Sequence, residues 1–170
     1  MSSTPAIVAT PARLVLDTNV VMDLFHFLAP PLARLRKAIT EKQVICLANA
    51  HTLAELERVT GYPQFRLDDV GRDNLLQRYR DHLTVVPATP GDADLPPLPK
   101  CRDPDDQIFL TLAQSAKADL LISRDNLVLK LARARQRPCP FAILDPNAAM
   151  RHLFGDTDSD HTPTEHQLVL

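Results

Sequence analysis

Short, continuous runs of apolar residues recur along this chain. They cover residues 14–16, 44–47, 120–122 and 141–144, and a weaker fifth run covers 84–86. Because these runs do not alternate between apolar and polar residues, they are typical of strands that are covered on both faces, as in a parallel sheet.

The segments between these runs carry apolar residues at helical spacing. They predict helices over 20–28, 32–39, 53–59, 67–79, 104–116 and 127–134, and one more after the last strand. Strands that alternate with helices predict an α/β fold, here a three-layer sandwich. Its central, mostly parallel sheet should have four to five strands, with helices on both faces. The proline-rich stretch 87–101 is interpreted as a loop within this domain.

The domain is expected to span residues 13–154, between a flexible N-terminus (1–12) and a disordered acidic tail (155–170). No segment reaches the ~18 consecutive apolar residues of a membrane span, and the first residues do not resemble a signal peptide. The three cysteines are widely spaced, which excludes a disulfide framework and a thiolate zinc site. The sequence therefore predicts a cytoplasmic protein that does not associate with membranes.

The net charge is −2, and four acids without any Lys or Arg lie after residue 155. The remaining 17 acids and 19 bases give the rest of the chain a charge of about +2, which is low for a nucleic-acid-binding protein. Binding of RNA would therefore require bound cations or a local basic patch. The candidate patch consists of Arg124, Lys130, Arg133, Arg135 and Arg137, and a solvated helix face is the alternative interpretation.

Only four glycines are present, and they form neither a phosphate-binding P-loop nor a dinucleotide-binding motif. Acidic residues instead follow two of the predicted strands, because Asp17 comes after run 14–16 and Asp125 after run 120–122. Ligands of open α/β sheets collect at the carboxyl ends of the strands. Two carboxylates there would repel each other unless a divalent cation such as Mg²⁺ binds between them.

Each acid also has a structural interpretation. Asp17 could cap a helix that begins near Val20, although Thr18 or Asn19 could fill that role and leave Asp17 free. Asp125 could begin the next helix. In the Asp103–Pro104 helix start, Asp103 is interpreted as the cap, whereas Asp106 could either close a capping box or turn inward. Glu55, three residues after Thr52, also matches a capping box.

Four segments together resemble the PIN domain, the nuclease module of many bacterial toxin–antitoxin pairs and of RNA-processing factors. They are residues 14–20, 53–56, 103–113 and 118–125, and they occur in the order of that family. The likeness covers about residues 13–131, and the last strand and helix extend it to about 153. Each motif is short, and it is their order that makes the resemblance specific.

The resemblance implies a metal-dependent ribonuclease with one or two Mg²⁺ or Mn²⁺ ions. The implied ligands are Asp17, Glu55, Asp106 and Asp125, with Glu57 as the weaker alternative to Glu55. Thr18, Asn19 and Ser123 are expected to hold these carboxylates by hydrogen bonds, and Asp103 is expected to support the ligands from a neighbouring position. Many relatives carry a further acid where this chain has Leu127, which implies weaker binding of a second metal ion.

RNA is the implied substrate, and an antitoxin protein and a second copy of this chain are candidate partners. Phe25, Phe27 and Leu28 could form an exposed apolar surface for such a partner, or they could pack inside. Two alternative functions are a PIN-like binding scaffold that has lost catalysis and another Mg²⁺-dependent phosphoryl hydrolase. The Asp-x-Asp motif of aspartyl-phosphate hydrolases is missing, because position 19 is Asn.

Overall fold

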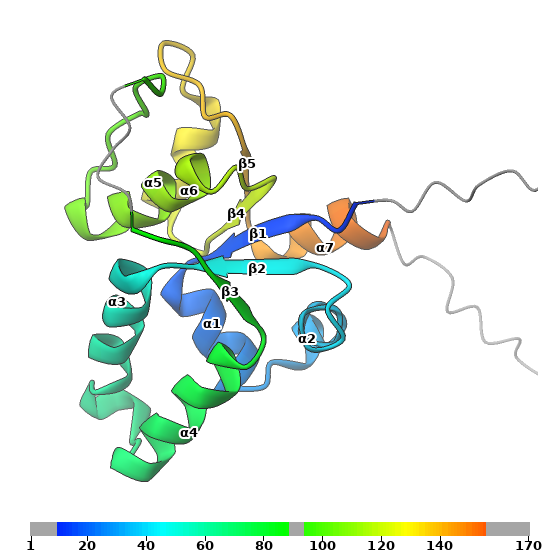
Figure 1. Cartoon of the computed structure of the whole chain (residues 1–170), viewed down its shortest axis with the longest axis vertical. Helices are drawn as coiled ribbons and strands as arrows, with labels where there is room; N and C mark the ends of the chain where they lie inside the picture. The colour runs from blue at the N-terminus through cyan, green and yellow to red at the C-terminus, as the bar shows by residue number, and fades with distance from the viewer. Residues whose placement is uncertain (1–9, 89–93, 156–170) are drawn as a thin grey trace, which may run out of the picture.

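The computed structural model describes residues 10–88 and 94–155 (Figure 1). Five strands form one sheet in the order β3-β2-β1-β4-β5, and all four pairings are parallel. The strands are β1 (Arg13–Leu16), β2 (Ile45–Ala48), β3 (Leu83–Val85), β4 (Leu120–Ile122) and β5 (Ala142–Leu144). The predicted α/β fold with a parallel sheet is therefore confirmed, and each strand lies within one residue of its apolar run.

Helices cover both faces of this sheet. One core joins Leu14 and Leu16 of β1 to α1 (Thr18–Phe25), α2 (Ala33–Thr40), α3 (Ala50–Thr60), α4 (Asp69–Arg80) and α7 (Pro146–Phe154). The other core joins Val15, between those two leucines, to α5 (Gln107–Ser115) and α6 (Asn126–Lys130). Successive strand residues point to opposite faces, so continuous apolar runs are needed to fill both cores. Figure 1 shows the resulting three layers.

Helix boundaries differ from the pattern more than strand boundaries do. The first helix begins at Thr18 rather than Val20, and the third begins at Ala50, three residues before the predicted start. The predicted helices 104–116 and 127–134 each divide into an α-helix and a short 3-10 helix, at Pro104–Asp106 and Leu131–Arg133. Polar capping groups determine where these helices begin and end, so the spacing of the apolar residues does not reveal the exact helix boundaries.

The central strand β1 brings the predicted acids together. It pairs with β4 in the register Leu16↔Ile122, and Asp17 N donates to Ile122 O over 3.0 Å. The residues that follow the two strands, Asp17 and Ser123, therefore lie at the same edge of the sheet.

Of the predicted apolar surface, Phe25 packs inside against Tyr79, with 5.4 Å between ring centroids, whereas Phe27 and Leu28 are exposed. No helix within residues 10–88 and 94–155 has the length and apolar character needed to cross a membrane. Of the predicted flexible N-terminus (1–12) and disordered tail (155–170), residues 1–9 and 156–170 lie outside the described residues.

Candidate metal and RNA site

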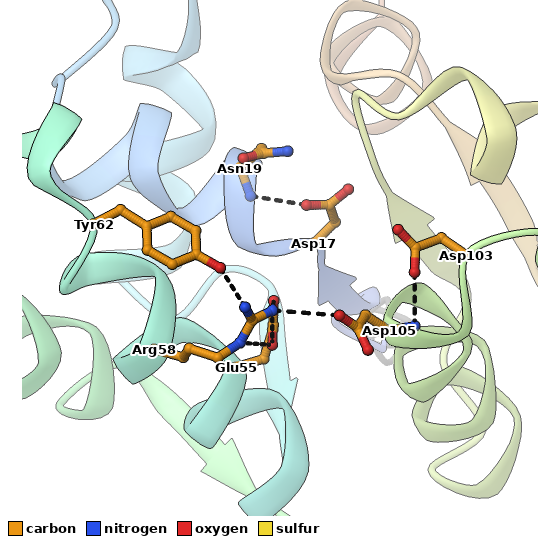
Figure 2. Close-up of polar contacts among 7 residues, drawn as sticks. All are labelled: Asp17, Asn19, Glu55, Arg58, Tyr62, Asp103 and Asp105. Atoms are coloured by element: carbon orange, nitrogen blue, oxygen red, sulfur yellow. Dashed lines mark hydrogen bonds and ion pairs between the residues drawn. The ribbon is translucent and has the colours of Figure 1, made fainter.

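Asp17 is buried directly after β1, and its carboxylate accepts hydrogen bonds from two neighbouring residues. Its Oδ1 accepts a hydrogen bond from Asn19 N over 2.8 Å, so Asp17 itself caps α1 (Figure 2). This corrects the expectation that Thr18 or Asn19 would take the cap and leave Asp17 free. Burial raises the pKa of Asp17, hydrogen bonds from Ser123 and Asn19 oppose the increase, and the charges of Asp125 and Asp23 add to it.

Ser123 links Asp17 to Asp125. Its hydroxyl donates to Asp17 Oδ2 over 2.5 Å and accepts from Asp125 N over 3.0 Å. Asp125 in turn caps α6, because its Oδ1 accepts from Leu127 N over 2.6 Å. Capping occupies one oxygen of each carboxylate, so the structural and the functional interpretation are compatible for both acids.

Asp106 turns inward from the helix start instead of capping it. It precedes α5, makes no side-chain cap hydrogen bond, and its Oδ2 is buried without a hydrogen-bond partner. Burial raises the pKa of Asp106 to about 6, with further contributions from the carboxylates of Asp17 and Asp125. Three acids from separate segments of the chain therefore act on one another electrostatically.

Glu55 is engaged by a neighbour on its own helix. Arg58 Nη2 lies 2.7 and 2.8 Å from the two carboxylate oxygens of Glu55, and Arg58 Nε donates over 3.0 Å. The same guanidinium reaches Asp105 Oδ2 at 3.5 Å and donates to the Tyr62 hydroxyl (Figure 2). Arg58 thus spans from α3 to the segment before α5. The expected capping box of Thr52 with Glu55 is absent, because Asn49 and Thr52 form it instead.

The donor set fits a hard divalent cation. No group of three or more His, Cys, Asp and Glu side chains in residues 10–88 and 94–155 is arranged to hold a metal ion as it stands. Asp106 nevertheless presents a buried oxygen without a partner, close to two further carboxylates that raise its pKa. A bound cation would remove this repulsion, and carboxylate oxygens are the ligands that Mg²⁺ and Mn²⁺ prefer.

The residues expected to support the acids behave differently from one another. Asn19 contributes its backbone N–H, and Ser123 its hydroxyl. Asp103 caps the 3-10 helix by accepting from Asp105 N over 3.0 Å. The predicted hydrogen bond from Thr18 is not formed, since its hydroxyl is buried without a partner. Adjacent residues at a helix start point in different directions, so Thr18 does not face the carboxylate of Asp17.

The predicted basic patch divides in two. Arg124 forms an ion pair with Asp23 of α1, with 2.5 Å between Nε and Oδ2. Arg135 and Arg137 instead line surface cavities, and Lys130 and Arg133 are exposed. Asp23 and Arg58 were not among the residues predicted from the sequence. The spacing of Arg58 three residues after Glu55 is the signal that could have revealed that pair.

Comparison with known proteins identifies the family of this chain. A profile of the PIN domain family matches residues 13–127, which is more than half of the chain. The protein therefore belongs to the PIN domain family, whose members are generally nucleases. The segments on which the resemblance rested all lie inside the matched range. No curated protein sequence matches the chain.

Two solved structures are similar in fold. One is VapBC2 from Rickettsia felis bound to a DNA fragment from their promoter, with a TM-score of 0.51 and 12% identity over 78% of this chain and 98% of that chain. The other is PAE2754 from Pyrobaculum aerophilum, with a TM-score of 0.51 and 15% identity over 91% of this chain and 100% of that chain. At these identities, the likeness concerns the fold alone.

Proposed function

We propose that this protein is a divalent-metal-dependent endoribonuclease that hydrolyses phosphodiester bonds of RNA. The observation that carries the proposal is the carboxylate of Asp106, whose Oδ2 is buried without a partner and whose pKa is raised by burial and by the charges of Asp17 and Asp125. Such an arrangement is unfavourable for folding alone and favourable for binding a cation.

Asp17, Asp106 and Asp125 would hold Mg²⁺ or Mn²⁺, and Glu55 would join them once it separates from Arg58. A cation bound there supplies Lewis-acid chemistry, which activates water and neutralises the charge that develops on the leaving oxygen. Ser123 fixes the orientation of Asp17 relative to Asp125 through its two hydrogen bonds. The carboxylates themselves need not transfer protons.

Cleavage assays on the full chain test this proposal. A labelled RNA should be cut in Mg²⁺ or Mn²⁺, remain intact in EDTA, and be cut again when the metal is restored. Asp106→Asn should abolish cleavage, whereas Asp73→Asn, at an exposed position of α4, should not. A wild-type protein that binds RNA without cutting it under any of these metal conditions would be a binding scaffold instead.

We also propose that the chain acts in the cytoplasm as the toxin of a toxin–antitoxin pair. The similar VapBC2 structure is a complex bound to a DNA fragment from its promoter, and this chain presents Phe27 and Leu28 on its surface. An adjacent reading frame that encodes a small DNA-binding protein, and inhibition of cleavage by that protein, would support this role. Cleavage that continues at a saturating concentration of that protein would contradict this role.

A further inference from the structure

A cavity of about 730 Å³ opens between the proline-rich segment and α5. Its size is within the range of small-ligand sites. Leu95, Pro97 and Leu98 form an apolar wall, and Thr111 of α5 contributes a hydroxyl. That hydroxyl donates to Gln107 O over 3.0 Å, so its oxygen remains able to accept a hydrogen bond from a ligand.

The proline-rich wall is anchored to α5 by side chains. Gln107 accepts from Cys101 N over 2.7 Å and donates to Pro99 O over 3.3 Å. One and a half to two turns along the same helix, Gln114 donates to Pro96 O over 2.7 Å. Because prolines restrict the backbone and two glutamines fix three of its groups, this wall is formed before any ligand arrives.

The cavity adjoins the start of α5, which follows Asp106 in the chain. Pro104 and Gln107, which line it, flank the segment that carries Asp106. Cys101 lines it as well, and burial raises the pKa of its thiol, with the charges of Asp106 and Asp125 adding to the increase. A polymer bound across the carboxylates would therefore place a neighbouring unit at this cavity.

Positive charge surrounds the opening. Lys100 and Arg137 line the cavity, and Arg137 also lines a second cavity of about 320 Å³ together with Arg135. None of the ion pairs found in residues 10–88 and 94–155 involves these three cations. They are available for the phosphates of a nucleic-acid strand.

We propose that this cavity is a subsite for one unstacked nucleotide of the RNA strand, next to the phosphate that is cut. The inference rests on the proposed function. The base enters between Leu95, Pro97 and Thr111, and the flanking phosphates contact Lys100 and Arg137. A base can enter only when it is not paired in a helix, so the subsite selects single-stranded RNA.

Binding of an end-labelled eight-nucleotide single strand to the full chain tests the subsite, by fluorescence anisotropy in EDTA and in Ca²⁺. Thr111→Trp fills the cavity and Arg137→Ser removes one phosphate contact, and each should weaken binding about tenfold. Arg80→Ser, at a position of α4 that does not line the cavity, is the matched control and should bind within about twofold of the wild type. Thermal melting confirms that each variant is folded.

A scan with single abasic nucleotides separates a base subsite from general attraction. One abasic position should weaken binding to the wild type and leave binding to Thr111→Trp unchanged, since the cavity is already filled. Unchanged affinity in both Thr111→Trp and Arg137→Ser, or no binding by the wild type in either buffer, overturns the subsite. Cleavage in Mg²⁺ is measured in parallel. If RNA binding depends on the cavity but no RNA is cleaved, the subsite is supported and the proposed nuclease activity is wrong. If RNA is cleaved but the variants bind RNA as tightly as the wild type, the nuclease activity is supported and the subsite is wrong.

Discussion

Arg58 holds both carboxylate oxygens of Glu55, the one predicted metal ligand that is not part of the group formed by Asp17, Asp106 and Asp125. The pair lies on one helix face, three residues apart, and the guanidinium also reaches Asp105. Arg58 and a bound cation would compete for the same two oxygens. The free protein is therefore expected to bind metal less tightly than its carboxylates alone would allow.

Replacing Arg58 by Met should strengthen metal binding, because Glu55 then has no competing partner. Half of the Arg58 side chain is exposed, and ion pairs at exposed positions are weak, so the gain should be at most about fivefold. Calorimetric titration of the RNA-free protein with Mn²⁺ measures it. The gain should disappear when Arg58→Met is combined with Glu55→Gln. A gain of equal size in that double variant would show that Arg58 acts through its general charge and not by holding Glu55.

Asp106 should make the metal-free protein less stable as the pH rises. Its pKa is about 6 in the folded protein against 3.8 ordinarily, so the folded state binds this proton more tightly than the unfolded chain does. The free energy of unfolding should therefore fall between about pH 4 and pH 6. The full shift would correspond to about 3 kcal/mol, and because Asp106 is partly exposed, solvent screening reduces this to on the order of 1–2 kcal/mol. This decrease in the free energy of unfolding should be absent in Asp106→Asn. Urea unfolding in EDTA across this pH range measures it.

Asp73→Asn provides the comparison for this series, because Asp73 is an exposed residue of α4. It should retain the full dependence on pH. If Asp106→Asn instead followed the same pH profile as the wild type, the inward orientation of Asp106 would be wrong, and with it the proposed cation site.

The sheet could be predicted from the sequence because its strands are buried on both faces. Such strands must be apolar at every position, and runs as short as 120–122 therefore identify them. Helix starts were predicted less well. Asp17, Thr18 and Asn19 are all suitable capping residues, and the choice of Asp17 follows from its place beside β4, which no local pattern records.

The candidate site could be predicted only in part, for a similar reason. The order of the short motifs pointed to Asp17, Asp106 and Asp125, and the structure places the charges of Asp17 and Asp125 where they raise the pKa of Asp106. Whether Glu55 faces those acids or a neighbour depends on how α3 packs against α5. The spacing of Arg58 allowed the ion pair, but that spacing also occurs on helix faces that have no function.

The proposed chemistry also predicts the ends of the RNA products. Water attacks phosphorus in this reaction, so the ribose 2′-hydroxyl is not the nucleophile. Cleavage should leave 5′-phosphate and 3′-hydroxyl ends, which mass spectrometry of the fragments distinguishes. A substrate with a single 2′-deoxy residue at the cleavage position should still be cut. Products with a 2′,3′-cyclic phosphate would contradict the mechanism.

Metal binding should stabilise the fold through Asp17. At ~100 times its dissociation constant, Mg²⁺ should raise the free energy of unfolding by about 2.7 kcal/mol. For a chain of 170 residues this corresponds to roughly 5–10 °C in melting temperature, at about 2–4 °C per kcal/mol. Asp17→Asn should lose most of that increase, because the charge that attracts the cation is gone.

The same variant separates capping from metal binding in EDTA. Asn at position 17 still offers an oxygen to Asn19 N, and its amide can donate to the Ser123 hydroxyl in place of the present bond. It also removes a buried charge that Asp125 and Asp23 repel. We therefore expect Asp17→Asn to melt at or above the wild-type temperature in EDTA. Melting well below the wild type, together with the full Mg²⁺ shift, would make Asp17 a structural residue and place any metal elsewhere.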